Sequence, residues 1–274
     1  MTITKSSAAR TAASPLRRLI APALAALFVF VLLLGTPHAH ADQWYFKKTD
    51  DHTQPPLDSA QERIASCNGY YVNQKATGEK VIYLTFDAGY ENGNVNAILN
   101  ILDKHRAPGA FFVLEHFVRD HPELIQKMDI LGCEVCNHTC SHADMSVADR
   151  ATFENELNNL ESICMELTQV PMAPFYRPPE GKYSLENLQW AQEMGYATVF
   201  WSFAYADWDN DKQPDPKQSL QNLLDHVHNG EILLLHPTSS TNAAILDDFL
   251  TQLENQGYRF GKLAELTATK QKAE

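Results

Sequence analysis

Positive charge is scarce along most of this 274-residue chain. Residues 42–274 hold all 34 acidic side chains but only 18 of the 22 Lys and Arg residues, which gives them a formal net charge of −16. Nucleic-acid binding depends on cationic side chains that neutralise phosphates. The charge balance therefore argues against a nucleic-acid partner and against direct attraction to anionic lipid headgroups.

Cysteine is also sparse, and its number is odd. An odd number cannot pair completely within one chain, and nothing in the spacing resembles a small disulfide scaffold. Cys133, Cys136 and Cys140 could suit a thiolate metal site. However, Cys133 and Cys136 fall in a predicted buried strand, where cysteine is a common packing residue. We therefore predict packing roles for Cys133, Cys136 and Cys140, and leave open whether any of the five cysteines pair; the other two are Cys67 and Cys164.

Acidic residues are absent from the first 41 positions. Four basic residues come first, followed by an apolar run at 19–35, then Pro37 and the small-residue pattern Ala39-His40-Ala41. This layout is typical of a secretory signal cleaved after Ala41. The run is near the lower limit for a bilayer span, so an uncleaved N-terminal anchor is the alternative. In either case we expect residues 42–274 to act outside the cytoplasm, at the cell wall or the outer face of the membrane.

The rest of the chain shows neither internal repeats nor low-complexity segments, and its 44% hydrophobic and 20% charged content is ordinary for a globular protein. Apolar runs alternate with helical patterns such as 95–105, where Val95, Ile98, Leu99 and Leu102 recur at helical spacing. Such alternation predicts an α/β domain of parallel strands. The seven predicted strands are 81–86, 109–114, 133–137, 173–176, 197–203, 231–236 and 258–262.

Boundary signals divide the chain further. Ser146 with Asp149 resembles a capping box, Asp215 precedes a proline at a helix start, and Gly195 and Gly257 indicate helix ends. We expect one domain, with residues 42–80 as a lead-in that wraps it, 81–266 as its catalytic part and 267–274 as a polar tail. The expected state is a monomer.

Chemically capable side chains fall at the predicted carboxyl ends of the strands. In a parallel sheet these ends meet at one edge, where barrel and open α/β enzymes place their active sites. We therefore expect a shared site. The side chains concerned are Asp87, His116, His138, His142, Arg177, Asp207 and His236.

Several of these residues suggest chemistry on their own. His138 and His142 would lie on the same side of one helical turn, where they could share a divalent ion such as zinc. Asp87 could ligate metal or act as a general base, and its pKa would depend on neighbours such as Arg177. His236 ends a very apolar strand, which suits a general acid near neutral pH and equally a core histidine.

Five motifs taken together resemble the polysaccharide deacetylases of carbohydrate esterase family 4. The resemblance covers residues 81–266 and implies a distorted (β/α) barrel of about seven parallel strands. The stretches 83–93 and 199–208 are most similar to the delta-lactam-biosynthetic de-N-acetylases of spore-forming bacteria. The motifs are TFDAG at 85–89, HTCSH at 138–142, RPPEG at 177–181, DW at 207–208 and LLLH at 233–236.

The subgroup implies removal of the acetyl group from N-acetylmuramic acid in peptidoglycan, toward muramic delta-lactam in the spore cortex. By the same resemblance, Asp87 is the general base and His236 the general acid. Arg177 would hold Asp87, and Asp207 would hold or tune its catalytic neighbours. Peptidoglycan glycan strands are the implied partner, with membrane contact only through an uncleaved N-terminal segment.

The resemblance also implies a metal and a substrate pocket. His138 and His142 would bind a divalent metal, with zinc the leading candidate. A backbone N–H near Glu180 would stabilise the oxyanion, and Leu234 with Trp208, together with Trp201, would wall a slot for the acetyl methyl group. The remaining residue, His116, is a candidate replacement ligand or substrate contact, or a structural histidine.

Position 88 departs from the family pattern. Most members carry a second Asp where this chain has Ala88, and that Asp completes a His-His-Asp metal site. Fewer protein ligands favour weaker metal binding. Two alternatives therefore stand beside the leading function: a deacetylase of N-acetylglucosamine in peptidoglycan or chitin-like glycans, and a catalytically silent wall-binding protein.

Overall fold

The computed structural model describes residue 2 and residues 41–268. The predicted signal or anchor at 1–41 therefore lies almost entirely outside the described residues, as do tail positions 269–274. Within the described part, none of the helices combines the length and apolar character needed to cross a membrane.

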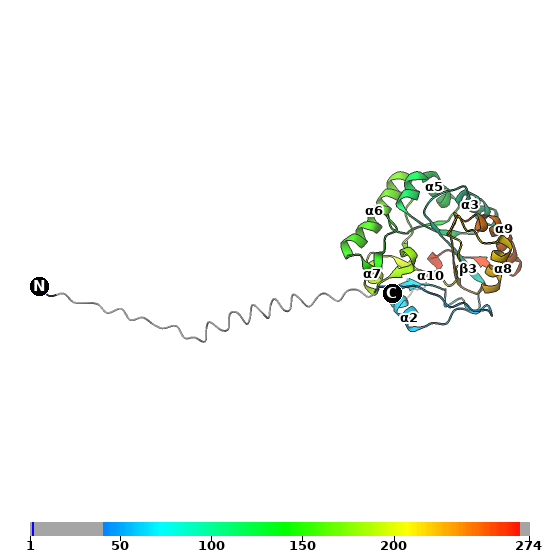
Figure 1. Cartoon of the computed structure of the whole chain (residues 1–274), viewed down its shortest axis with the longest axis horizontal. Coiled ribbons are helices and arrows are strands. Elements are labelled where there is room, and N and C mark those ends of the chain that lie inside the picture. The colour runs from blue at the N-terminus through cyan, green and yellow to red at the C-terminus, as the bar shows by residue number, and fades with distance from the viewer. Residues whose placement is uncertain (1, 3–40, 269–274) are drawn as a thin grey trace. The chain divides into compact units, whose positions relative to one another are not determined.

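A curved sheet of parallel strands forms the centre of the domain, with helices around its outer face (Figure 1). The strands pair in the order β10, β3, β4, β5, β6, β8, and β9 pairs with β3. The bounds are β3 Val81–Ala88, β4 Gly109–Val113, β5 Glu134–Asn137, β6 Phe175–Tyr176, β8 Ala197–Val199, β9 Glu231–Leu235 and β10 Arg259–Phe260. The predicted α/β fold of about seven parallel strands in one domain is confirmed.

The predicted strand 197–203 is shorter than expected. It ends at Val199, and the backbone changes its hydrogen-bonding partner three residues later, at Ser202. Phe200 donates its backbone N–H to Tyr70 (2.7 Å), whereas the N–H of Ser202 donates to Ile232 of β9 (2.9 Å). This switch distorts the barrel and joins the segment after β8 to β9.

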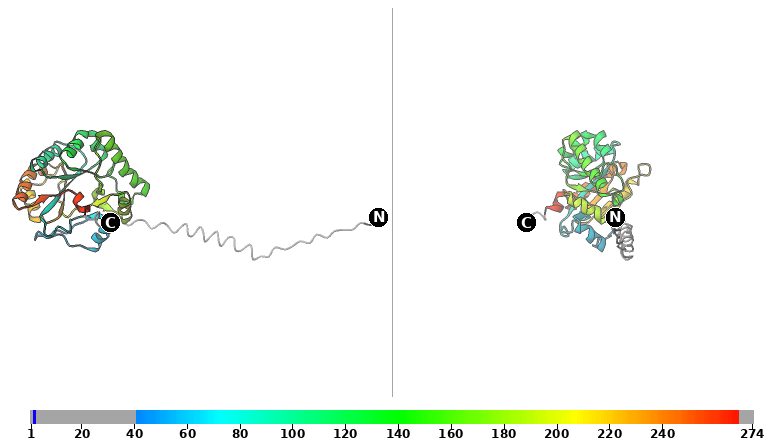
Figure 2. Two further views of the ribbon diagram at one scale, coloured as in Figure 1. Left: turned by 180° about the vertical axis from the view of Figure 1, so that it is seen from behind. Right: turned by 90° about the vertical axis from the view of Figure 1, so that its left-hand side faces the viewer.

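Helices cover the sheet from outside, as Figures 1 and 2 show. Val95, Ile98, Leu99 and Leu102 are all buried, which confirms the amphipathic stripe of the predicted helix 95–105. The helices are α2 Ser59–Ser66, α3 Asn94–His105, α4 Glu115–Asp120, α5 Pro122–Ile130, α6 Arg150–Thr168, α7 Leu185–Glu193, α8 Pro216–His226, α9 Ser240–Asn255 and α10 Ala264–Thr267, with short 3₁₀ turns η1 Met145–Val147 and η2 Pro179–Gly181.

One predicted helix boundary was wrong. Ser146 and Asp149 do not form a capping box, because extended backbone at Ala148 separates two helices. Ser146 lies in η1, whereas Asp149 alone caps α6 by accepting the N–H of Thr152 (2.8 Å).

The other boundary predictions agree with the structure. Asp215 caps α8 by accepting the N–H of Gln218 (2.9 Å), and Pro216 opens that helix. Gly195 and Gly257 follow α7 and α9 with φ of 93° and 83°, left-handed values that glycine adopts without steric conflict.

Residues 42–80 do more than cover the domain. The strand β2, Gly69–Tyr70, pairs in parallel with β8 and extends the sheet by one strand. The strand β1, Asp42–Gln43, pairs antiparallel with β7, Lys182–Tyr183. Trp44 is buried against Phe200, with ring centroids 4.9 Å apart. At the other end, Thr267 belongs to the last turn of α10 rather than to a tail.

All five cysteines are buried and unpaired. Burial raises the pKa of the Cys133 thiol to about 11, so this side chain stays a neutral packing group at physiological pH.

An acid lies deep in the barrel wall at the start of β9. Glu231 is buried and accepts a hydrogen bond from the backbone N–H of His228 (3.1 Å). The His228 ring is itself hydrogen-bonded to the Ser202 hydroxyl (2.9 Å). Burial raises the pKa of Glu231 from 4.5 to about 8. The folded chain therefore keeps a proton here that the unfolded chain loses.

This proton makes stability depend on pH. As pH rises from about 4.5 to about 8, Glu231 lowers the free energy of unfolding. The reason is that in this window the unfolded state binds fewer protons than the folded state. We expect Glu231→Gln to become more stable relative to wild type between pH 5 and pH 8, measured by urea unfolding. The exposed Glu166→Gln is the control, and a difference that stays constant with pH for Glu231→Gln would refute the assignment.

Candidate active site

The side chains expected at one edge of the sheet do meet there, although not all in the expected positions. Asp87 is the penultimate residue of β3 rather than the residue after it, and His116 lies inside α4. Arg177 and His236 directly follow β6 and β9.

Arg177 is fully buried and joins three strands. Its Nη1 donates to Asp87 Oδ1 (2.7 Å) and its Nη2 donates to Thr85 Oγ1 (2.8 Å). Its Nε donates to the Val199 carbonyl (3.0 Å), and the guanidinium lies 4.1 Å from the Phe112 ring centroid. These contacts fix both the arginine and one oxygen of Asp87.

The environment of Asp87 keeps it ionised. Burial alone would raise the pKa of this carboxyl, but the charge and hydrogen bond of Arg177, together with the charge of His236, outweigh burial, so the pKa is lowered. Its second oxygen, Oδ2, lies 3.6 Å from His138 Nε2, beyond hydrogen-bond distance. This oxygen is available to accept a proton.

His236 is held by Asp207 in two ways. Asp207 Oδ1 lies 2.7 Å from the ring Nδ1, and Oδ2 accepts the backbone N–H of His236 (2.8 Å). Asn242 in turn donates to Asp207 Oδ2 (2.6 Å). Because Nδ1 is engaged, Nε2 is the ring nitrogen that remains for chemistry.

The same contacts favour the protonated ring. Burial would lower the pKa of His236, but the hydrogen bond and charge of Asp207, assisted by Asp87, raise it above 6.5. A histidine that keeps its proton near neutral pH can act as a general acid. Asp87 and His236 thus form an ionised carboxylate and an imidazolium close enough to shift each other's pKa.

His138 and His142 come together, but not on the helical turn expected from their spacing. Thr139 and His142 have φ of 72° and 57°, so the segment turns irregularly after β5. The two rings nevertheless approach to 5.0 Å between centroids. The expectation about proximity was right and its geometric reason was wrong.

The state of His138 suits metal ligation. Its Nδ1 is hydrogen-bonded to the Arg177 carbonyl (2.8 Å), so Nε2 is the ring nitrogen that remains for a metal. Burial lowers its pKa to about 4, so the ring is neutral. Neutral imidazoles braced by a carbonyl are typical metal ligands. Among the described residues, however, no group of three or more His, Cys, Asp or Glu side chains is arranged to hold a metal ion.

The predicted substrate contacts differ in exposure. Leu234 in β9 is buried, whereas Trp208 is 61% exposed, with its ring 6.2 Å from that of His236. Glu180 has a left-handed φ of 55°, and its exposed side chain pairs with Lys182 (2.8 Å).

His116 reaches the end of β3. A Cβ placed on Gly89 would lie 3.7 Å from its Nε2, so the ring closely approaches the residues that follow Asp87.

Sequence reasoning missed two supporting residues. Asn242, in the first turn of α9, orients Asp207, and no motif indicated it. Thr85 binds Arg177 and stands in the TFDAG motif, so its place beside Asp87 could have been noticed.

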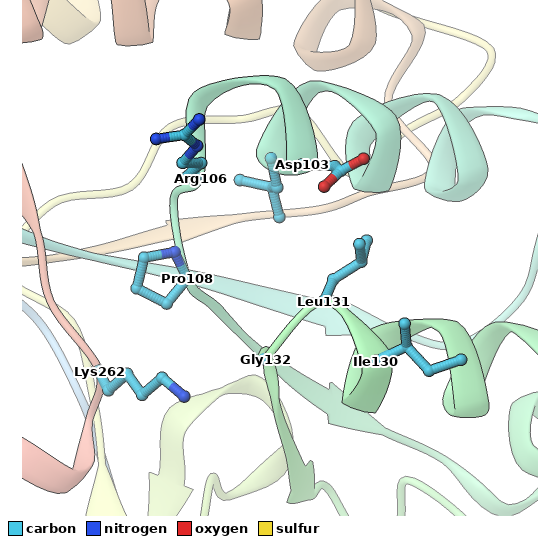
Figure 3. Close-up of a pocket in the computed structure, with 8 residues that line it drawn as sticks. Asp103, Arg106, Pro108, Ile130, Leu131, Gly132 and Lys262 are labelled. Atoms are coloured by element: carbon cyan, nitrogen blue, oxygen red, sulfur yellow. The ribbon is translucent and has the colours of Figure 1, made fainter.

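A separate hollow of about 290 Å³ lies at the opposite edge of the sheet, near Pro108 and Gly132, which precede β4 and β5 (Figure 3). It is lined by Asp103, Arg106 and Lys262 together with apolar residues and contains none of the predicted site residues.

Asp207→Asn tests the electrostatics of the acid. The change removes the charge that favours the imidazolium while burial remains, so we expect the pKa of His236 to fall. Nuclear magnetic resonance titration of the His236 ring measures it, and Asp209→Asn, a neighbouring acid exposed at the surface, is the control. A His236 pKa unchanged in Asp207→Asn would contradict the role of this carboxylate.

Comparisons with known proteins agree with this arrangement. A family model described as polysaccharide deacetylase matches residues 74–199. The chain is 38% identical over 230 residues to the peptidoglycan-N-acetylmuramic acid deacetylase PdaA of Bacillus subtilis, covering 83% of this chain and 86% of that protein.

A solved structure of PdaA, described as a family 4 carbohydrate esterase, aligns with a TM-score of 0.81 at 36% identity, over 86% of this chain and all of that one. A peptidoglycan-N-acetylglucosamine deacetylase of Bacillus cereus is 30% identical over 203 residues, covering 72% of this chain and 93% of that protein. The chain therefore belongs to the polysaccharide deacetylases of carbohydrate esterase family 4, hydrolases that act on amide C–N bonds.

Proposed function

We propose that this chain removes the acetyl group from N-acetylmuramic acid in peptidoglycan, a step toward muramic delta-lactam in the spore cortex. The observation that carries the proposal is a braced acid and a braced base at one edge of the barrel, with Asp87 held by Arg177 (2.7 Å) and His236 held by Asp207 (2.7 Å). The similarity to PdaA, whose name states this activity, supports the choice of sugar.

In the proposed reaction, Asp87 acts as general base. Arg177 holds its Oδ1, and the remaining Oδ2 takes a proton from the attacking water. Attack on the acetyl carbonyl gives a tetrahedral intermediate with an oxyanion, which a backbone N–H near Glu180 stabilises. In this segment Glu180 and Gly181 both have left-handed backbone, with φ of 55° and 68°.

His236 completes the reaction as general acid. Asp207 holds Nδ1, so the proton on Nε2 passes to the departing amine as the C–N bond breaks. The products are acetate and the free amine of the sugar. Leu234 and Trp208 remain the proposed walls of the acetyl slot, and His116 a proposed substrate contact.

His138 and His142 are the proposed ligands of a divalent metal, with zinc preferred because imidazole nitrogens suit it. When bound there, such an ion would polarise the acetyl carbonyl and lower the pKa of water. Ala88 is fully buried among apolar side chains and supplies no ligand. We therefore propose weaker binding than a site with three protein ligands gives.

Peptidoglycan is the proposed partner, because the names of two relatives, a muramic acid deacetylase and a glucosamine deacetylase, both state peptidoglycan as the substrate. Such a substrate implies work outside the cytoplasm, in agreement with the predicted export segment at 1–41. We propose a monomer, with membrane contact only if that segment is uncleaved.

The catalytic assignment is tested on peptide-free peptidoglycan strands, with mass spectrometry reporting which sugar loses acetyl. We expect loss from the muramic sugar, and a fall in kcat/KM of about 10²-fold or more in both Asp87→Asn and His236→Ala, because each removes one proton-transfer group. Full activity in either variant would reject that residue's role.

Two results of the same assay would overturn the proposed function. Acetyl loss from N-acetylglucosamine alone would favour the glucosamine deacetylase. No loss from either sugar with any metal, in a folded chain, would favour the silent wall-binding protein.

Metal dependence gives a separate prediction. We expect chelation to abolish activity and zinc to restore it, and His142→Gln to weaken zinc binding about tenfold or more, measured by calorimetry without substrate. His105→Gln is the control, because His105 pairs with Asp247 and Glu254 on the outer helices. Equal zinc affinity in wild type and His142→Gln would reject the ligand assignment.

A further inference from the structure

Two large aromatic side chains are exposed beside the acid and base. Trp208 is 61% exposed and its ring lies against His236, while Tyr90 is 48% exposed. Tyr90 is the third residue after Asp87, so their Cα atoms are at most about 11 Å apart. The Tyr90 hydroxyl accepts a hydrogen bond from Asn210, two residues after Trp208. The two rings therefore belong to adjoining loops at the carboxyl edge of the sheet.

The loop that carries Tyr90 is fixed relative to the catalytic acid. Asn92 and Asn94 both donate their side-chain amides to the carbonyl of Thr238 (2.8 Å each). Thr238 lies two residues after His236.

The loop that carries Trp208 is anchored to the same segment. The Gln213 side chain donates to the Asp207 carbonyl (2.9 Å) and accepts the N–H of Thr241 (3.1 Å). Both loops are thus held in place before a ligand arrives, which reduces the entropy lost on binding.

Charge around these rings indicates what kind of ligand they suit. Glu91 follows Tyr90 directly, and Asp209 and Asp211 follow Trp208. The one cation in that loop, Lys212, is paired with Asp209 (3.6 Å). Acidic side chains would repel a carboxylate or a phosphate, whereas the C–H face of an uncharged sugar packs well on an aromatic ring.

We propose that Tyr90 is a specificity-determining residue, a stacking platform for the uncharged N-acetylhexosamine next to the sugar that is deacetylated. This inference rests on the proposed function and deepens it. Peptidoglycan strands alternate N-acetylmuramic acid with N-acetylglucosamine, so a muramic sugar at Asp87 and His236 has uncharged neighbours. The enzyme then recognises a strand rather than a single sugar.

Kinetics with substrates of different length test the platform. The full chain is assayed on peptide-free strands of at least four disaccharides and on free N-acetylmuramic acid, with released acetate as the readout. We expect Tyr90→Ala to raise KM for strands about tenfold more than KM for the single sugar, a difference of about 1.4 kcal/mol in binding free energy. We expect kcat on strands to change little.

Three outcomes would overturn the proposal. They are an unchanged KM for strands, an equal rise in KM for strand and single sugar, and a Tyr90→Phe variant as impaired as Tyr90→Ala. The last would assign the effect to the hydroxyl bond with Asn210 rather than to the ring. Ile130→Ala is the matched control, because Ile130 is 81% exposed on α5 beside the hollow at the opposite edge.

A binding measurement separates this proposal from the proposed function. Calorimetry with tetra-N-acetylchitotetraose, an uncharged strand, is done in the Asp87→Asn background, where turnover plays no part. We expect Tyr90→Ala to weaken this binding about tenfold and Tyr90→Phe to leave it nearly unchanged. If the wild-type enzyme shows no deacetylation while this pattern of affinities holds, the proposed reaction is rejected and the sugar platform is supported. If Asp87→Asn alone and its combinations with Tyr90→Ala and Tyr90→Phe bind with equal affinity, the platform is rejected.

Discussion

The buried ion pair between Arg177 and Asp87 is the interaction on which the site depends. A fully buried guanidinium is tolerated only when its donors are satisfied, and here they bind Asp87, Thr85 and the Val199 carbonyl. These partners lie on β3 and β8, while Arg177 itself follows β6. Removing one partner from such a pair typically costs about 3–5 kcal/mol, because a charge is left buried alone. The same contact therefore supports the barrel and orients the base.

Two carboxylates of the site have different tasks because their surroundings differ. The Asp87 side chain is 12% exposed and forms an ion pair with Arg177 through one oxygen, so its other oxygen faces the site. The Asp207 side chain is fully buried, and both of its oxygens are hydrogen-bonded, to His236 and Asn242. One is placed to exchange a proton, and the other to keep a proton on its neighbour.

Periodicity was sufficient to predict parallel strands and the meeting of Asp87, Arg177 and His236, whereas the barrel was implied by the family resemblance. The reason is that parallel strands force their carboxyl ends together, whatever the details of each strand. What could not be predicted depends on three-dimensional pairing. The early end of β8 precedes a change of hydrogen-bonding partner at Ser202, and no local pattern encodes it.

Side-chain networks were equally hidden. Asn242 reaches Asp207 across 35 positions of sequence, and a single Asn in an amphipathic helix carries no signal of its own. The turn that joins His138 to His142 depends on left-handed backbone at Thr139, where sequence spacing suggested a helix. Residue spacing therefore indicated which groups meet, but not the path of the chain between them.

The double attachment of His236 to Asp207 has a further consequence. Because one carboxylate holds both the ring and the backbone N–H, the orientation of the imidazole is tied to the end of β9 rather than to the loop that follows. Its rotamer freedom is lost when the chain folds, so none of that entropy remains to be lost at the transition state. Because Asp207 stands in the loop between β8 and α8, that loop has to keep its conformation for the proton donor to keep its position.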